Sequence, residues 1–148
     1  MAIWQFDLSF IPSGDPLPSR SGEGFDVPSL TEERALEAHA YLSKYLGEPW
    51  LMLEDGLVFG EEQGHRVDLV RTENGGAEVS ARIDARGSVE QFCNAVCELA
   101  RALDCLLFSP EFWLAFQAEP ALLAAALEKS RASAFVRNPL QVLRGSEK

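Results

Sequence analysis

The fold is decided by residues 77–103, which read AEVSARIDARGSVEQFCNAVCELARAL. From Ala77 to Ala85 apolar and polar residues alternate without a break. This period of two predicts a strand with one apolar and one polar face, as in an antiparallel sheet that is covered on one side. After Gly87 the apolar residues recur every three or four positions, which predicts an amphipathic helix. These residues are Val89, Phe92, Val96, Leu99, Ala100 and Leu103.

The sequence before this stretch predicts another strand and another helix. Residues 3–11 alternate well enough to predict a strand. Residues 29–32 (SLTE) form a capping-box pattern, so we expect a helix to begin there and to end at Gly47. A second capping-box pattern at residues 88–91 (SVEQ) predicts the start of the helix described above.

Two β-hairpins are predicted between these helices. Their turn signals are Asp55-Gly56 and residues 73–76 (ENGG), because Asn, Asp and Gly tolerate the backbone angles of tight turns. We expect the hairpin strands at residues 50–53, 57–59, 66–72 and 77–85.

The C-terminal third predicts shorter elements. Residues 105–108 are apolar and compatible with an edge strand. Pro110 predicts the start of a helical turn through residues 112–116, because proline is favoured at the first helical position. Pro120 opens a further helix, which Asn138-Pro139 breaks.

The order of the elements, β-α-β-β-β-β-α-β-α, predicts an α+β fold with a mainly antiparallel sheet and helices packed on one face. We expect a single domain over residues 1–148 with a long irregular loop at about residues 12–29, which is rich in Pro, Gly and Ser. The core is expected to contain Phe6, Leu8, Leu42, Val79, Ile83, Phe92, Val96, Leu99 and Leu103.

Composition excludes several classes of protein. The 148 residues are 47% hydrophobic and 24% charged, which is ordinary for a globular domain and excludes global disorder. The formal net charge is −10 and the pI is about 4.6, so nucleic acid is not an expected partner. No apolar run approaches the roughly 20 residues needed to cross a bilayer. We expect no membrane partner.

Cysteine usage and the first residues predict a cytoplasmic location. The N-terminus has no basic segment before an apolar one, which is unlike a signal peptide. The three cysteines are an odd number without a CxxC motif, and we expect them to be reduced, buried and not bound to metal. They are Cys93, Cys97 and Cys105.

The sequence lacks the common catalytic motifs. It contains neither the G-x-S-x-G elbow nor the phosphate-loop pattern, and two isolated histidines, His39 and His65, do not supply a zinc site. We therefore predict no catalytic residue, no cofactor and no metal. Asp7 and Asp84 interrupt strands, and a solvated sheet face is the simpler interpretation of both. Arg82, Asp84 and Arg86 form either a solubilising ladder or a recognition surface.

Charge is divided unequally along the chain. Residues 1–64 carry 12 acidic and three basic side chains, a charge of −9, whereas residues 65–148 carry 11 acidic and 10 basic side chains, a charge of −1. General solubility is one explanation; the other is an acidic face that attracts a protein with a basic surface. The expected partner-binding residues are Glu33, Glu37, Glu54, Asp55, Glu61 and Glu62.

A run of five apolar residues, Phe112-Trp113-Leu114-Ala115-Phe116, is too long for one face of a helix. Either neighbouring helices cover it, or Phe112, Trp113 and Phe116 form a subunit interface, since aromatic residues anchor interfaces. A homo-oligomer is therefore one of the expectations.

The tail at residues 130–139 (SRASAFVRNP) is similar in character to the ends of immunity proteins that bacteria pair with secreted polymorphic toxins. The small, acidic α+β character of the chain resembles them too. The resemblance implies a non-enzymatic, cytosolic protein-binding module that inhibits a toxin domain. The alternative is a small-ligand binder or a carboxylate-based enzyme, with a cleft under the 12–29 loop.

Overall fold

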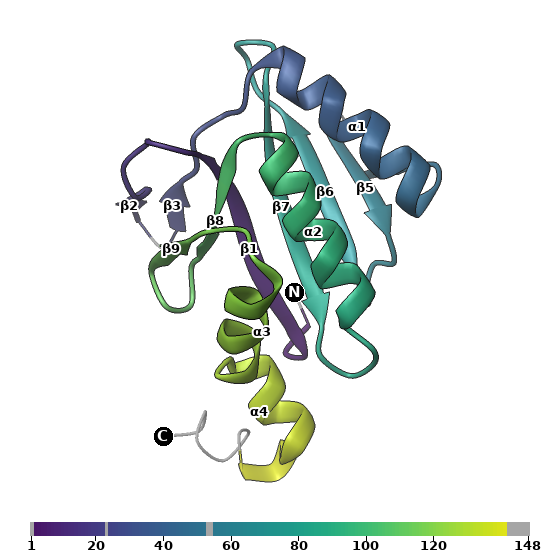
Figure 1. Cartoon of the computed structure of the whole chain (residues 1–148), viewed down its shortest axis with the longest axis vertical. Helices are drawn as coiled ribbons and strands as arrows, with labels where there is room; N and C mark the ends of the chain where they lie inside the picture. The colour runs from purple at the N-terminus through teal and green to yellow at the C-terminus, as the bar shows by residue number, and fades with distance from the viewer. Residues whose placement is uncertain (1, 23, 53–54, 142–148) are drawn as a thin grey trace.

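The computed structural model describes residues 2–22, 24–52 and 55–141 and has an α+β fold (Figure 1). Its centre is a seven-stranded sheet with the order β4-β5-β6-β7-β1-β8-β9, in which every pair of neighbours is antiparallel. The strands are β1 (Gln5–Pro12), β4 (Trp50–Met52), β5 (Gly56–Gly60), β6 (Arg66–Arg71), β7 (Ala77–Asp84), β8 (Cys105–Ser109) and β9 (Leu114–Phe116).

The helices pack on one face of this sheet, as predicted. In Figure 1, α1 (Glu32–Leu46) and α2 (Glu90–Ala102) lie in front of the strands. α1 contacts β5, β6 and β7, and α2 contacts β7 and β8. α3 (Pro120–Glu128) packs beside α2, and α4 (Arg131–Arg137) follows it and contacts β1. Within the part of the chain that is described, no helix is long and apolar enough to cross a membrane.

The core lies between the sheet and the helices. All nine predicted core residues, from Phe6 to Leu103, are buried and belong to one hydrophobic cluster. β7 alternates between buried and half-buried side chains along its whole length, so the period-two pattern is confirmed. α2 buries one complete stripe, including Phe92, Val96 and Leu99.

Both predicted capping boxes are wrong in position. α1 begins after Thr31, whose hydroxyl accepts the backbone N–H of Arg34, while the Ser29 hydroxyl bonds the Thr72 hydroxyl at 2.7 Å. α2 begins after Val89 and has no side-chain cap. Gly47 ends α1 as predicted, with φ at +88°.

The region after α2 differs most from the prediction. Residues 112–116 do not form a helical turn: β9 pairs with β8, which therefore lies inside the sheet and is not an edge strand. The backbone reverses because Trp113 adopts a left-handed conformation, with φ at +52°, just before β9. Downstream, the single predicted helix is two helices, because the Ser130 hydroxyl caps α4 through the N–H of Ser133.

Two connections also differ from the prediction. In the first hairpin Gly56 belongs to β5 and pairs with Met52, so Asp55-Gly56 is not a two-residue turn. The segment at 12–29 contains a short hairpin of β2 (Ser19–Ser21) and β3 (Gly24–Asp26). The second main hairpin, between β6 and β7, forms where it was predicted.

Candidate functional site

The sheet face opposite the helices, which we call the open face, carries polar side chains at its centre. Successive residues of a strand point to opposite faces, so the buried side of β7 faces the helices and Glu78, Ser80 and Arg82 face the other way. Residues opposite one another on neighbouring strands share a face, and Asp7 and Ser9 of β1 lie opposite Arg82 and Ser80. The open face therefore brings together charges from strands that are distant in sequence.

The segment at 12–29 packs on this face through β3. Phe25 lies 5.6 Å from the ring of Phe108 and 5.8 Å from the ring of Trp113, and Arg20 stacks 3.8 Å above Trp113. Phe108 lies opposite Ser9, which places this aromatic cluster on the open face. Trp113 is thus an internal anchor for the β2–β3 hairpin.

Between this hairpin and the sheet is a cleft of about 240 Å³, which we call the open-face cleft. Its floor is the sheet face, which is mostly polar, and its apolar walls come from β3, the residue after β3 and the residue after β8. It matches the position that the alternative hypothesis required, under the 12–29 segment. The lining residues include Asp7, Ser9, Val70, Glu78, Ser80 and Arg82 on the floor and Phe25, Val27 and Pro110 on the walls.

Asp7 is the least satisfied group in the cleft. Its Oδ1 is buried and accepts no hydrogen bond within the described part of the chain, and the Nε of Arg82 lies 3.5 Å from it. Burial raises the pKa of Asp7 above its ordinary value, and the charge of Arg82 opposes this only in part. Burial, followed by the negative charge of Asp26, likewise raises the pKa of Glu78. The cleft therefore holds two carboxylates whose ionised forms lack full compensation.

Arg66, by contrast, is fully engaged beside the cleft. Its Nε and Nη2 each donate to one oxygen of Asp68 at 2.8 Å, and the side chains of this pair are only 4% and 6% exposed. The guanidinium also donates to the carbonyl of Glu62 at 3.3 Å and contacts the sulfur of Met52 at 3.4 Å. This ion pair is therefore satisfied largely by contacts within the protein.

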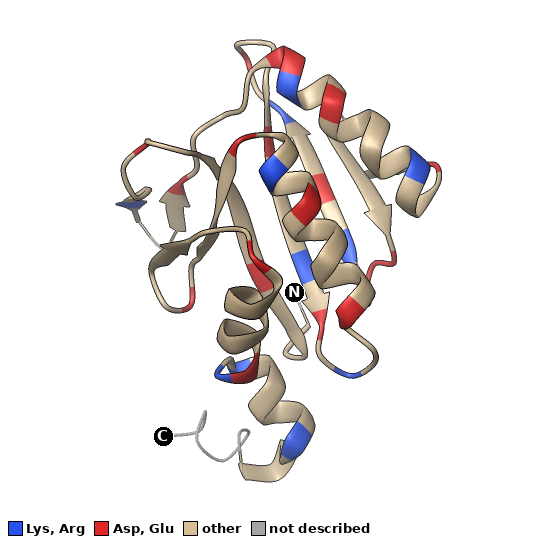
Figure 2. Ribbon diagram, in the orientation of Figure 1, with Lys and Arg blue, Asp and Glu red and all other residues tan. Residues whose placement is uncertain are grey.

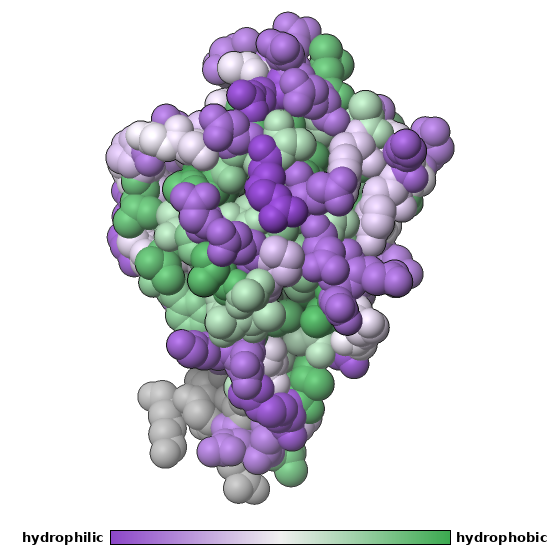
Figure 3. All heavy atoms as spheres, in the orientation of Figure 1, coloured by the Kyte–Doolittle hydropathy of each residue, from purple (hydrophilic) through white to green (hydrophobic). Residues whose placement is uncertain are grey.

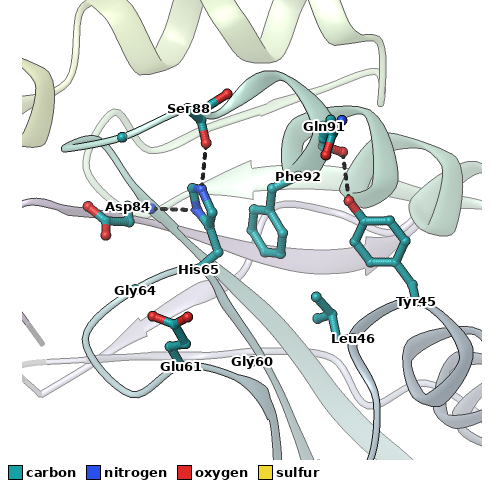
Figure 4. A pocket seen from close by; sticks show the side chains of 11 residues that line it. Tyr45, Leu46, Gly60, Glu61, Gly64, His65, Asp84, Ser88, Gln91 and Phe92 are labelled. Carbon is teal, nitrogen blue, oxygen red and sulfur yellow. Dashed lines mark hydrogen bonds between the residues drawn. The ribbon is translucent and has the colours of Figure 1, made fainter.

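A larger hollow of about 590 Å³ lies between the end of α1, the start of α2 and the turn after β5 (Figure 4). His65 stands at its side, stacked on Phe92 with ring centroids 4.6 Å apart. The Nδ1 of His65 accepts the backbone N–H of Asp84 at 3.0 Å, so this nitrogen carries no proton and Nε2 donates to the carbonyl of Ser88 at 2.9 Å. Both ring nitrogens are used structurally, and the geometry ties the β5–β6 turn to the start of α2.

Of the three residues considered as a ladder or a recognition surface, Asp84 and Arg86 form an ion pair at the end of β7, and Arg82 contacts Asp7 instead. The carboxylate accepts hydrogen bonds from the Arg86 side chain at 2.9 and 3.0 Å, and the guanidinium stacks 4.1 Å above Trp4. Burial alone would raise the pKa of Asp84, but hydrogen bonds and charge from Arg86 lower it overall. The pair stabilises the end of the strand.

The predicted partner-binding acids do not form one patch. Glu33 and Glu37 are exposed on α1, whereas Glu61 and Glu62 are exposed in the turn after β5. Figure 2 shows acidic positions spread over helices, strands and turns. Asp55 is exposed at the opposite end of β5, about 20 Å from Glu61 along an extended strand that rises about 3.4 Å per residue. Glu54 lies outside the described residues. Among the described residues, none of the ion pairs involves these five acids.

The predicted interface aromatics are divided between two environments. Phe112 is 39% exposed and Leu114 is 55% exposed, while Trp113 and Phe116 are half-buried. An apolar hollow of about 360 Å³ lies between β9 and α3, and Figure 3 shows hydrophobic residues gathered over these elements. Neighbouring elements cover this run only in part.

The three cysteines are free thiols and buried, as predicted. Burial raises the pKa of Cys93 to about 12 and those of Cys97 and Cys105 to about 11, so the reactive thiolate is suppressed. Within residues 2–22, 24–52 and 55–141, no group of three or more His, Cys, Asp or Glu side chains is placed to hold a metal ion.

Comparison of the chain with protein-family models, with curated proteins and with solved structures finds no match. No related protein therefore indicates what the site does, and its chemistry follows from its own residues alone. Sequence reasoning identified Asp7 and Arg82 individually but missed Glu78 and Phe25 as members of a cleft. The alternating pattern of the strand predicts that Glu78 points to the sheet face opposite the helices. No pattern near Phe25 predicts that this residue packs over Glu78.

Proposed function

We propose that this chain is a non-enzymatic, cytoplasmic protein-binding module that holds a partner with a basic surface. Its concrete form would be an immunity-type inhibitor, which neutralises a toxin domain by stoichiometric binding. One observation carries the proposal: among the described residues, five exposed acids of the N-terminal half take part in no ion pair, while three arginines of the sheet region are paired with aspartates.

The exposed carboxylates of Glu33, Glu37, Asp55, Glu61 and Glu62 take part in none of the ion pairs among the described residues. Arg66, Arg82 and Arg86 are instead held by aspartates of the same sheet. Residues 1–64 carry a net charge of −9, so this half presents mainly negative charge to solvent, and such a field accelerates the approach of a basic protein.

The site supports binding better than catalysis. His65 has both ring nitrogens in structural hydrogen bonds, and the raised pKa values of the thiols suppress nucleophilic sulfur. The two carboxylates of the open-face cleft have no described base or nucleophile beside them except serines. A protein surface recognised through charge needs none of these groups.

The test is capture of a partner from the native organism with the full chain, followed by association kinetics at two salt concentrations. We expect a captured protein with a basic surface, and an association rate that falls as salt rises, because exposed charges are screened beyond about 8 Å at physiological ionic strength. An acidic partner, or an association rate indifferent to salt, would contradict the proposal.

Charge reversal locates the surface. Glu33→Lys with Glu37→Lys should slow association and leave the fold intact, since exposed helix positions tolerate such changes. The matched control is Glu119→Lys with Glu128→Lys, which makes the same change in net charge at two exposed positions, the N-cap and the last residue of α3. Equal slowing by both pairs would show that net charge acts, and not the surface of α1.

A further inference from the structure

The open-face cleft has the features of a receptor for one side chain. Its volume of about 240 Å³ is below the roughly 300–1,000 Å³ of typical small-molecule sites. Apolar walls from Phe25 and Val27 stand over a floor that carries carboxylates. This combination suits a group with an apolar stem and a polar end.

The negative charge of the cleft floor determines that the polar end of the bound group is a cation. Asp7 and Glu78 outnumber the one arginine of the cleft, and Asp26 adds a further negative charge near Glu78. Arg82 sits 3.5 Å from Asp7 and leaves Oδ1 without a hydrogen bond. The Asp7 side chain is 34% exposed although Oδ1 is buried, so a donor cation would bind the other oxygen of this carboxylate, whereas an anion would meet two carboxylates.

The wall of the cleft is held in place independently of any ligand. Phe25 packs against Phe108 and Trp113 in tilted and edge-on geometry, and Arg20 covers the outer face of the Trp113 ring. Trp113 itself is fixed by the turn into β9, where its backbone is left-handed. A preformed wall lowers the entropy lost when a side chain is bound.

From these observations we propose that the open-face cleft binds the cationic end of a lysine or arginine side chain presented by the partner protein. The methylene stem lies along Phe25 and Val27, and the ammonium or guanidinium donates to Asp7 and Glu78. This inference rests on the proposed function, because it supplies the point at which a basic partner is recognised.

The test is a titration of the ¹⁵N-labelled full chain with two blocked tripeptides, acetyl-Gly-Arg-Gly-amide and acetyl-Gly-Lys-Gly-amide. We expect saturable shifts of the amide signals of Ser9, Phe25 and Ser80. Acetyl-Gly-Gln-Gly-amide, which has a polar end without charge, should not produce them. Loss of two charge-assisted hydrogen bonds in Asp7→Asn with Glu78→Gln should weaken binding about tenfold or more.

The matched control is Glu90→Gln with Glu98→Gln, which removes two exposed carboxylates from α2 on the other side of the sheet. It should bind the basic tripeptides as the unmodified chain does. Equal shifts with the glutamine tripeptide, shifts confined to other residues, no saturable shifts, or unchanged binding by the cleft variant would each overturn the inference.

The result separates this inference from the proposed function. If a basic partner is captured through α1 but the basic tripeptides do not bind in the cleft, the cleft inference is refuted and the proposed function stands. If the tripeptides bind in the cleft but no basic partner is captured, the proposed function is refuted and binding of a basic side chain in the cleft stands. Urea unfolding of each variant establishes that it is folded before it is titrated.

Discussion

Removal of Asp68 should destabilise the fold strongly, because it leaves a buried guanidinium without its counter-ion. Arg66 would keep the Glu62 carbonyl at 3.3 Å, the Met52 sulfur at 3.4 Å and the Trp50 ring at 5.7 Å, and would lose both hydrogen bonds of 2.8 Å. Breaking a buried pair in this way costs about 3–5 kcal/mol, a large part of the roughly 5–15 kcal/mol that stabilises a domain.

The measurement is urea unfolding of Asp68→Leu followed by fluorescence of the tryptophans. With an m value of about 2 kcal/mol per M, the midpoint should fall by about 1.5–2.5 M. The double variant Arg66→Met with Asp68→Leu removes both charges, so it should recover most of the loss, and the double-mutant cycle gives the coupling directly. A loss below about 1 kcal/mol for Asp68→Leu, or a double variant less stable than either single one, would refute this reasoning.

Four further results are expected. Phe92→Ala should lower the free energy of unfolding by about 3–5 kcal/mol in the same assay, because the ring is buried and stacked on a histidine; an unchanged midpoint would place the ring outside the core. Asp7→Asn and Glu78→Gln should each raise the urea midpoint at neutral pH. The pKa of each carboxyl is raised in the folded state, so the stability it gives is present in acid and is lost as the pH rises through the folded-state pKa. A lowered midpoint would contradict the raised pKa values. The pKa of Asp84 is lowered in the folded state, so its stabilising effect is present above its unfolded-state pKa and is lost as the pH falls through its folded-state pKa. The difference in unfolding free energy between the unmodified chain and Asp84→Asn should therefore disappear in acid. The three thiols, whose pKa values are about 11 to about 12, should react with a thiol reagent at mildly alkaline pH only after denaturation, and rapid labelling of the native chain would contradict their burial.

Patterns that depend on near neighbours in the chain were predicted well. The alternation from Ala77 to Asp84 and the stripe of α2 gave the correct faces and the correct core, because a period of two or of 3.6 follows directly from backbone geometry. Elements without a period were predicted badly. Residues 112–116 are apolar throughout, so helix and strand could not be separated by pattern, and pairing with β8 decides between them.

The cleft was beyond prediction for a different reason. Asp7 and Arg82 become neighbours only because β1 pairs with β7, a long-range contact that no local signal specifies. The covering of Glu78 depends on where the β2–β3 hairpin packs, which is set by Phe25 reaching Phe108 and Trp113 across the sheet. Local sequence specifies faces, and tertiary contacts specify which faces meet.

The position of β1 in the sheet has a consequence for how the chain is made. β1 precedes the other strands of the sheet, yet its two neighbours are β7 and β8, so it gains its first partner in the sheet only when β7, at residues 77–84, has left the ribosome. The meander from β4 to β7 is built from successive hairpins of short sequence separation and is free to form earlier. Insertion of β1 is therefore expected to be the slow folding step, and until it occurs the inner edge of β7 is open to pairing with other chains.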